Sequence, residues 1–426
     1  MIFILKILNF LRVDNQLIHE VMLDRRRFIR NSLLTAAGAG LAGRLSVSSE
    51  ITPEPGNKLI NRRLGKTGIT LPVVSMGTGN AGNPALIRSA LDKGVKLFAT
   101  AAAYQEGNNE RMLGEALKGI PRDSFMILTN SFDISWIDTP TGILRPDFST
   151  DELLKRARAS LTRLGVDHVD IFTQPFAARR ESVFHGPAMQ AMETIKKEGI
   201  ARFIGIATHR YEPEAIRAAA DSGIHDVIMT SYNFLKDNRD QLEDAIRYAA
   251  DKGLGIIAMK TMAGAWYDRE RTKPVNTRAA LKWAIRNENI HTAVPDSSDF
   301  DQLTRNIDVM SDPELTGQEL KDLFPLTGEK ITDIYCQQCG ECLPGCPYGV
   351  DIPTFMRSYM YAYGHHNMPL ARNTLSEAGP AGNPCSECIT CTAACRMGFD
   401  IRKKICEIAR ISDVPDALLP KDFIWR

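Results

Sequence analysis

From about residue 58 to residue 324 the chain repeats one pattern, in which a short apolar run rich in Val and Ile is followed by a polar turn and an amphipathic segment. A bounded apolar run predicts a buried strand, and apolar positions three or four residues apart predict a helix. The eight candidate strands are Val73–Gly77, Val95–Ala99, Phe125–Leu128, His168–Phe172, Arg202–Ile206, Val227–Ser231, Gly255–Ala258 and Thr292–Val294.

Helical patterns lie between these strands. They include Pro84–Lys93, Asp151–Leu164, Ala188–Glu198, Pro213–Asp221, Gln241–Asp251 and Thr277–Asn287. Glycines that fit helix C-caps follow at Gly94, Gly165, Gly199, Gly223 and Gly253. Eight alternations predict an α/β fold, a (β/α)8 TIM barrel. A doubly wound open sheet is the alternative, but no G-x-G-x-x-G follows the first strand, which makes it less favoured.

All nine cysteines lie between Cys336 and Cys406. A large cysteine-free region followed by a cysteine cluster indicates metal binding rather than a disulfide scaffold. The spacing C-x2-C-x2-C-x3-C occurs twice and resembles a bacterial two-cluster ferredoxin, in which the fourth cysteine of each run ligates the other cluster. The expected [4Fe–4S] ligand sets are Cys336, Cys339, Cys342 and Cys395 for one cluster, and Cys385, Cys388, Cys391 and Cys346 for the other.

Zinc is the alternative metal, but zinc sites use two C-x-x-C pairs, and the third cysteine at the same interval would be redundant. Cys406 belongs to neither run, and we interpret it as a buried thiol on the final helix. The domain organisation that we expect is an export signal and linker over 1–50, a barrel over 58–325, and a small, mainly helical ferredoxin-type domain over 326–426.

The first residues resemble a twin-arginine export signal. Arg25 and Arg26 are followed by Phe28 and a soft apolar run from Ser32 to Gly43. That run is too short and too rich in glycine to be a convincing membrane span. We expect export to the periplasm, and a cytoplasmic protein if the signal is not functional; the alternative reading is a basic helix start. The net charge of +1, with acids and bases mixed along the chain, argues against a nucleic-acid partner.

Motifs along the middle of the chain resemble the aldo/keto reductase family. They are Arg63–Gly68, Met76–Gly79, Tyr104, Asn109–Glu110, Leu113–Gly114, Leu161–Gly165, Asp170, Gly199–Gly205 and Tyr232–Asn233. The resemblance implies carbonyl reduction with NADPH by a tyrosine acid, a lysine and an aspartate that tune it, and a histidine that orients the substrate. Tyr104 stands at the tyrosine position, but Ala99, Asn130 and Gln174 stand where the family has aspartate, lysine and histidine.

The positions that hold the nicotinamide in this family are altered too, and read Ala207, Thr208 and Met229. The charge of Asp296 would repel a 2′-phosphate, although Ser297, Ser298 and Asn306 remain available to a nucleotide. His209 follows the fifth strand and is a candidate acid or ligand, or it packs in the following turn. Lys260 follows the seventh strand and places a charge either in the cleft or in a surface salt bridge.

Three functions fit these patterns. The protein is an iron–sulfur oxidoreductase whose barrel binds a small molecule, or an electron carrier with a noncatalytic barrel, or an NADPH-dependent carbonyl reductase with a remodelled site. Clusters carry single electrons and favour the first two readings. Either of these needs a redox partner protein, and a flavin would link one- and two-electron chemistry, although no flavin motif is present.

Replacing both Arg25 and Arg26 with Lys should leave the protein in the cytoplasm, because the export machinery reads the arginine pair. Cell fractionation followed by immunoblotting measures this. Export of the doubly substituted protein would show that the pair is not a signal.

Overall fold

The computed structural model describes residues 59–131, 136–138, 141–174, 177–324, 332–379, 382–415 and 418–419. The chain divides after Gly56, and the candidate export signal lies outside the described residues. The barrel and the cysteine-rich segment lie together in one unit, Asn57–Arg426. Within the described residues, no helix has the length and apolar character needed to cross a membrane.

Eight parallel strands form the barrel. In chain order they are β3 (Met76–Gly77), β4 (Leu97–Ala99), β5 (Met126–Asn130), β8 (Val169–Gln174), β9 (Ala201–Thr208), β10 (Val227–Ser231), β11 (Gly255–Met259) and β12 (Thr292–Ala293). Each pairs with its neighbour in the order β12-β11-β10-β9-β8-β5-β4-β3. Parallel bridges from Val74 to Ala293 and from Gly77 to Asp296 join the first strand to the last. The sheet is therefore closed, which confirms the predicted barrel over the open sheet.

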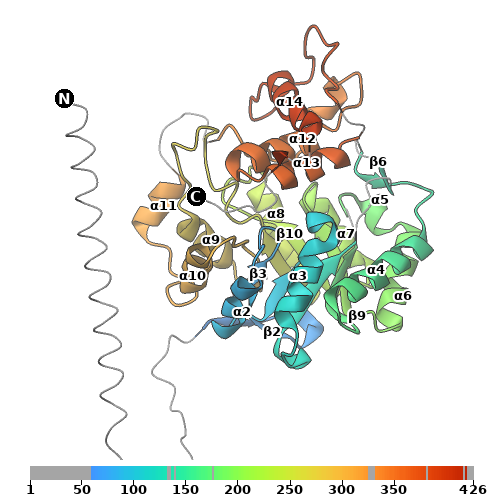
Figure 1. Ribbon diagram of the computed structural model, residues 1–426, viewed down its shortest axis with the longest axis vertical. Helices are drawn as coiled ribbons and strands as arrows, with labels where there is room; N and C mark the ends of the chain where they lie inside the picture. Colours follow the sequence, from blue (N-terminus) through green and yellow to red (C-terminus); the bar gives the residue numbers. More distant parts are fainter. Residues whose placement is uncertain are drawn as a thin grey trace, which may run out of the picture. The chain divides into compact units, whose positions relative to one another are not determined.

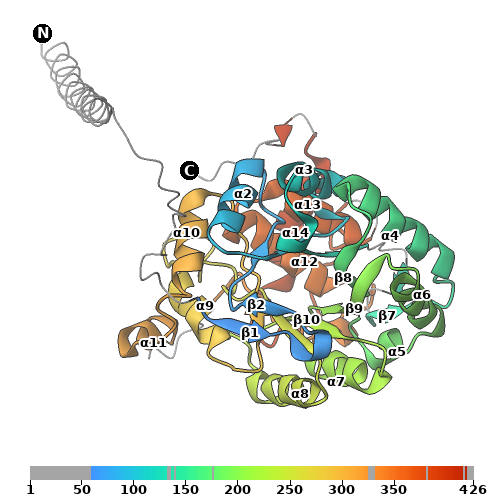
Figure 2. The same ribbon diagram turned by 90° about the horizontal axis from the view of Figure 1, so that it is seen from below.

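Helices surround the barrel (Figure 2). They are α2 (Pro84–Asp92), α3 (Asn108–Leu117), α4 (Thr150–Leu164), α5 (Arg180–Val183), α6 (Gly186–Lys197), α7 (Glu212–Ser222), α8 (Arg239–Asp251), α9 (Thr277–Ile285), α10 (Phe300–Asp308) and α11 (Gly317–Leu323). Local sequence sets their ends. The Ser149 hydroxyl accepts a hydrogen bond from the Glu152 N–H at the start of α4, and Gly165 ends that helix with φ of 66°. The other four glycines predicted as caps also have positive φ.

The N-terminal end of the barrel is filled by a hairpin. The strands β1 (Asn61–Arg63) and β2 (Thr70–Pro72) pair antiparallel, and Leu64, Ile69 and Leu71 from this hairpin join the core inside the barrel. The residues of that core from the strands, and from directly after β12, are Leu97, Ala99, Leu128, Ile171, Ala207, Val227, Met229, Ile257, Met259 and Val294. The opposite end, where the strands finish, is the end at which this fold places its sites.

The cysteine-rich segment is mainly helical, as predicted. Its elements are the turn η5 (Leu343–Gly345), the helix α12 (Ile352–Tyr359), the π-helix η6 (Met360–Gly364), the helices α13 (Met368–Glu377) and α14 (Ile401–Ala409), and the turn η7 (Arg410–Asp413). Figure 1 shows α12, α13 and α14 together on one side of the barrel. Buried Phe355, Met356 and Tyr359 on α12 join the main hydrophobic core, so the segment packs as part of the molecule.

Candidate functional site: a cavity under the cysteine-rich segment

A cavity of about 440 Å³ lies at the C-terminal ends of the strands. This volume falls within the range of about 300–1,000 Å³ that is usual for small-molecule sites. Barrel residues that include Ala99, Met229 and Met259 line its floor. Its remaining wall comes from the cysteine-rich segment, through Tyr335, Met360, Tyr361 and His365. The site is therefore built by both parts of the chain.

The loop between β11 and α9 forms one side of the cavity under backbone strain. Lys260, Ala263, Ala265 and Arg271 all have positive φ, between 47° and 64°. Such conformations are costly for residues with a Cβ atom and concentrate at functional sites. The Asn233 side chain donates to the Lys260 carbonyl over 3.0 Å, which helps to hold the lysine in this conformation.

Lys260 joins the barrel to the cysteine-rich segment. Its Nζ donates a hydrogen bond to the Tyr361 hydroxyl and lies 4.7 Å from the centre of that ring. Tyr361 lies in the π-helix η6. Helices of this type are rare in proteins, and those that occur are often found at functional sites. His365 stacks edge-on against Tyr361, and burial, reinforced by the charges of Lys260 and Arg271, lowers its pKa to about 3. His365 is therefore a neutral group at physiological pH.

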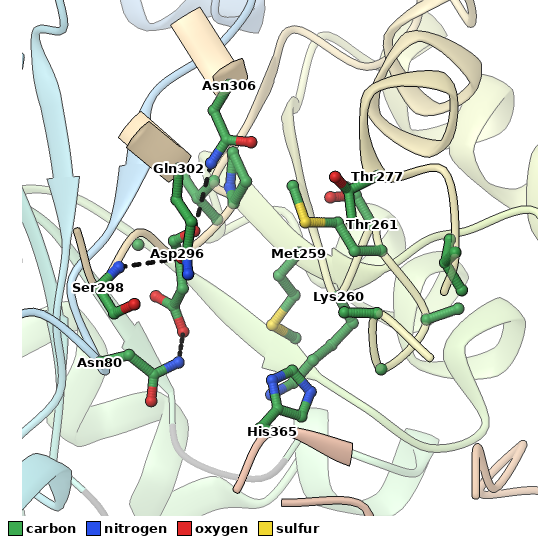
Figure 3. Close-up of a pocket in the computed structure, with 18 of the residues that line it drawn as sticks. Asn80, Met259, Lys260, Thr261, Thr277, Asp296, Ser298, Gln302, Asn306 and His365 are labelled. Carbon is green, nitrogen blue, oxygen red and sulfur yellow. Dashed lines mark hydrogen bonds between the residues drawn. The ribbon is translucent and has the colours of Figure 1, made fainter. Parts of the chain in front are cut away.

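Asp296 lies across the cavity from Lys260, beside Asn80 (Figure 3). The Asn80 amide donates to Asp296 Oδ2 over 2.9 Å. The carboxylate packs against the bare Cα of Gly77, where a Cβ atom would stand 2.4 Å from Asp296 Oδ1. Burial raises the pKa of Asp296, and the charge of Lys260 opposes that shift. The two residues therefore interact electrostatically through the cavity.

Of the two candidate catalytic residues, Tyr104 lines the cavity and His209 does not. The Tyr104 ring packs over Gly79, and burial, followed by the charge of Asp296, raises the pKa of its hydroxyl. Tyr104 is thus a hydrogen-bonding group and a weak acid. Burial and the charge of Lys260 lower the pKa of His209 well below its usual value, so this ring is neutral.

The three candidate nucleotide-binding residues lie close together after β12. Ser298 and Asn306 line the cavity, whereas Ser297 is buried and accepts a hydrogen bond from Asn306 Nδ2 over 3.1 Å. The Ser298 backbone N–H donates to Gln302, which lines the cavity as well. This wall of the cavity carries small polar groups, some of which hydrogen-bond to one another.

The other positions that the resemblance singled out have mixed roles. Ala99 and Met229 line the cavity, while Gln174 is buried and donates to the Ser182 carbonyl over 2.7 Å. Tyr232 is fully buried and donates to Glu243, which removes it from the cavity. Asn109 accepts hydrogen bonds from the buried hydroxyls of Thr78 and Thr100, which directly follow β3 and β4.

The first predicted cysteine set lines a second, smaller void. Cys336, Cys339, Cys342 and Cys395 surround it, together with apolar residues that include Ile352 and Met356. Burial raises the pKa of the Cys336 and Cys342 thiols to about 12. A cluster held here would be bound by the thiolates, so its binding would release these protons. Four cysteines in an apolar shell fit a [4Fe–4S] cluster, which we call cluster I.

The second predicted set also comes together. Burial raises the pKa of Cys385 to about 11, and the sulfurs of Cys388, Cys391 and Cys346 add to this shift because they lie nearby. Cys391 is exposed, so this site, for cluster II, is nearer to solvent. Cys406 is also close to Cys385 and is only partly buried, so the expectation of a buried thiol is wrong. Cys406 lies on α14, the helix that follows the second cysteine run in the chain.

Two families match the sequence. The Aldo/keto reductase family matches residues 83–278, and the 4Fe-4S dicluster domain matches residues 335–400. The chain joins an aldo/keto reductase domain to a 4Fe-4S dicluster domain. The dicluster match spans all eight predicted ligands and supports two [4Fe–4S] clusters.

Similar proteins match the aldo/keto reductase domain. L-galactose dehydrogenase of Arabidopsis thaliana is 25% identical over 307 residues, which cover 62% of this chain and 92% of the plant protein. The NADH-specific methylglyoxal reductase of Escherichia coli is 28% identical over 218 residues, 45% of this chain and 64% of that protein. An aldo-keto reductase from Bacillus halodurans in its holo form shares the fold with a TM-score of 0.51 at 19% identity, covering 63% of this chain and 97% of its own.

The residues of the dicluster domain that line the cavity were missed by sequence reasoning. Tyr335 directly precedes a cluster ligand, and His365 follows Tyr361 by four residues, just past the end of η6. Only the aromatic spacing signalled them, and such spacing is usually core packing. Lys260 was noted, and the structure places it in the cleft rather than in a surface salt bridge.

Paired substitutions test the crossed ligand sets. Cys336→Ala with Cys395→Ala removes two ligands of one site, and the protein should keep about four of its roughly eight irons. Cys385→Ala with Cys395→Ala removes a ligand from each site, and most iron should be lost. Iron and acid-labile sulfide assays on anaerobic protein measure this. The opposite ranking of the two double variants would contradict the crossed arrangement.

Proposed function

We propose that this protein is an iron–sulfur oxidoreductase in which an organic ligand of the cavity exchanges electrons with cluster I. Cluster II then connects cluster I to an external redox protein. When bound, the clusters supply one-electron transfer. The cavity supplies the place where a small molecule is held close to the first of them.

The observation that carries this proposal is that the cavity and the cluster I site share their walls. Tyr335 lines the cavity, and the next residue, Cys336, lines the cluster site. Met360 lines the cavity, and Met356, one helical turn earlier, lines the cluster site. At two places, neighbouring residues of the chain therefore line both the cavity and the cluster I site. The exposed Cys391 supports an exit to solvent at cluster II.

We further propose that the hydride route usual for the family is not used. Ala99, Asn130 and Gln174 have no group able to tune a tyrosine acid as the family's aspartate, lysine and histidine do. The raised pKa of Tyr104 fits this loss, because burial first and the charge of Asp296 second both favour the protonated hydroxyl. A group of this kind contributes about two to four orders of magnitude in rate.

Two other readings remain as alternatives. A remodelled NADPH-dependent reductase is favoured by Ser298 and Asn306, which line the cavity and would still meet a nucleotide. A solved aldo-keto reductase from Klebsiella pneumoniae in complex with NADPH shares the fold, with a TM-score of 0.50 at 20% identity over 63% of this chain and 95% of its own. A noncatalytic barrel is less favoured, because a docking module needs no cavity of this size. Flavin stays a further candidate for the cavity.

The place of action that we propose is the periplasm. The twin-arginine pattern around Arg25 and Arg26 is the support, because that route carries folded proteins and suits clusters inserted before export.

Anaerobic NADPH oxidation with a panel of aldehydes and ketones tests the proposed function. We expect turnover at least about a hundredfold below that of a reductase with the full set of groups. Tyr104→Phe should change the residual rate little, while both clusters still accept electrons from reduced methyl viologen. Rapid turnover that Tyr104→Phe abolishes would restore the standard reductase and refute the proposal.

A further inference from the structure

The cavity has two polar ends of opposite character. Lys260 and Tyr361 form one end, and Asp296 with Asn80 forms the other, as Figure 3 shows for the three of these residues that it labels. Apolar side chains, Met229, Met259 and Met360, also line the cavity. Figure 3 shows Met259 between Asp296 and Lys260. A ligand that fills this space meets a cation, an apolar wall and a carboxylate.

The lysine end is built to receive an anionic oxygen. Lys260 Nζ has three N–H donors, and its hydrogen bond to the Tyr361 hydroxyl uses one of them. Among the described residues no carboxylate forms a salt bridge with Lys260, and the charges of Asp296 and Glu377 act on it only over a longer distance. Arg271 also lines the cavity and adds positive charge near this end.

The aspartate end is built to accept hydrogen bonds. Asn80 holds Asp296 Oδ2, and the Gly77 Cα leaves room for Oδ1. The dicluster domain fixes this arrangement, because Asn367 Nδ2 donates to Asn80 Oδ1 over 2.6 Å. An ionised carboxylate offers about four acceptor positions. The Asn80 amide and the backbone N–H of Gly79 both donate to Asp296, which leaves about half of these positions for a ligand.

From these two ends we infer that the cavity binds a small organic acid that also carries a hydroxyl or amino group. Its carboxylate lies against Lys260 and the Tyr361 hydroxyl, and its hydroxyl or amine donates to Asp296. Its apolar part packs on the methionines. The inference rests on the proposed function and names the class of ligand for that same cavity.

Isothermal titration calorimetry of the anaerobic holoprotein with three matched probes tests the inference. Mandelate carries both groups, phenylacetate lacks the hydroxyl, and 1-phenyl-1,2-ethanediol lacks the carboxylate. We expect mandelate to bind tightest. Phenylacetate should bind about threefold or more weakly, and the diol about tenfold or more weakly, because hydrogen bonds to charged groups contribute more than neutral ones.

Variants assign each end. Lys260→Met should weaken mandelate to the level of the diol, and Asp296→Asn should shrink the difference between mandelate and phenylacetate. Lys273→Met removes an exposed charge from the same loop outside the cavity lining and should change nothing. Circular dichroism and iron content check that each variant is folded and loaded.

Three binding results would overturn the inference. They are no saturable binding of either acid, mandelate binding unchanged by Lys260→Met, or binding of inorganic phosphate in the absence of acid binding, which would assign the lysine end to a phosphate group. Calorimetry requires no electron transfer. Binding without electron exchange with the clusters would therefore refute only the proposed function, and electron exchange with ligands that lack a carboxylate would refute only this inference.

Discussion

The buried ion pair of Lys236 and Glu212 links the barrel to the cysteine-rich segment. Lys236 Nζ contacts Glu212 Oε1 at 2.5 Å and also donates to the carbonyl of Gln337, between two cluster I ligands, over 3.3 Å. Burial alone would lower the pKa of Lys236, but the charge of Glu212 raises it above its usual value. The charge therefore persists inside the protein. Removing either partner would leave the charge of the other buried and unpaired, which typically lowers the free energy of unfolding by about 3–5 kcal/mol.

Neighbouring contacts extend this constraint across the barrel end. Asn233 Nδ2 donates to the Tyr335 hydroxyl over 2.7 Å, and Gln337 Nε2 donates to the Leu235 carbonyl over 2.7 Å. The loop after β10 thus hydrogen-bonds to Tyr335 and Gln337, at the start of the first cysteine run. Because these hydrogen bonds hold Tyr335 in place, they also hold the wall that the cavity shares with the cluster I site. The dicluster domain therefore forms part of the cavity wall at the C-terminal ends of the strands.

The sequence predicted the parts of the structure that depend on local signals. The strand Val227–Ser231 was predicted to the residue, because its apolar run is bounded by polar turns on both sides. Gly94 and Gly165 were predicted as caps because positive φ favours glycine. The expected cysteine sets come from the doubled spacing together with its resemblance to a two-cluster ferredoxin.

The composition of the cavity could not be predicted in the same way. Lys260 and Tyr361 are 101 residues apart, and no local pattern indicates that a barrel lysine meets a tyrosine of the dicluster domain. His209 was singled out because it follows a strand, but the cavity is lined from the β11–α9 loop and from η6 instead. Such pairings are decided by how two folded parts pack, which a single sequence does not display.

The central claim is that a molecule in the cavity exchanges electrons with the clusters. The most direct measurement is stopped-flow recovery of cluster absorbance when dithionite-reduced protein, freed of excess reductant, is mixed anaerobically with organic acids and carbonyl compounds. In Met229→Trp the larger side chain fills the cavity floor, so recovery with an active compound should be lost while recovery with ferricyanide, which takes electrons at the surface, is kept. Equal recovery in the wild-type and filled proteins would contradict the account.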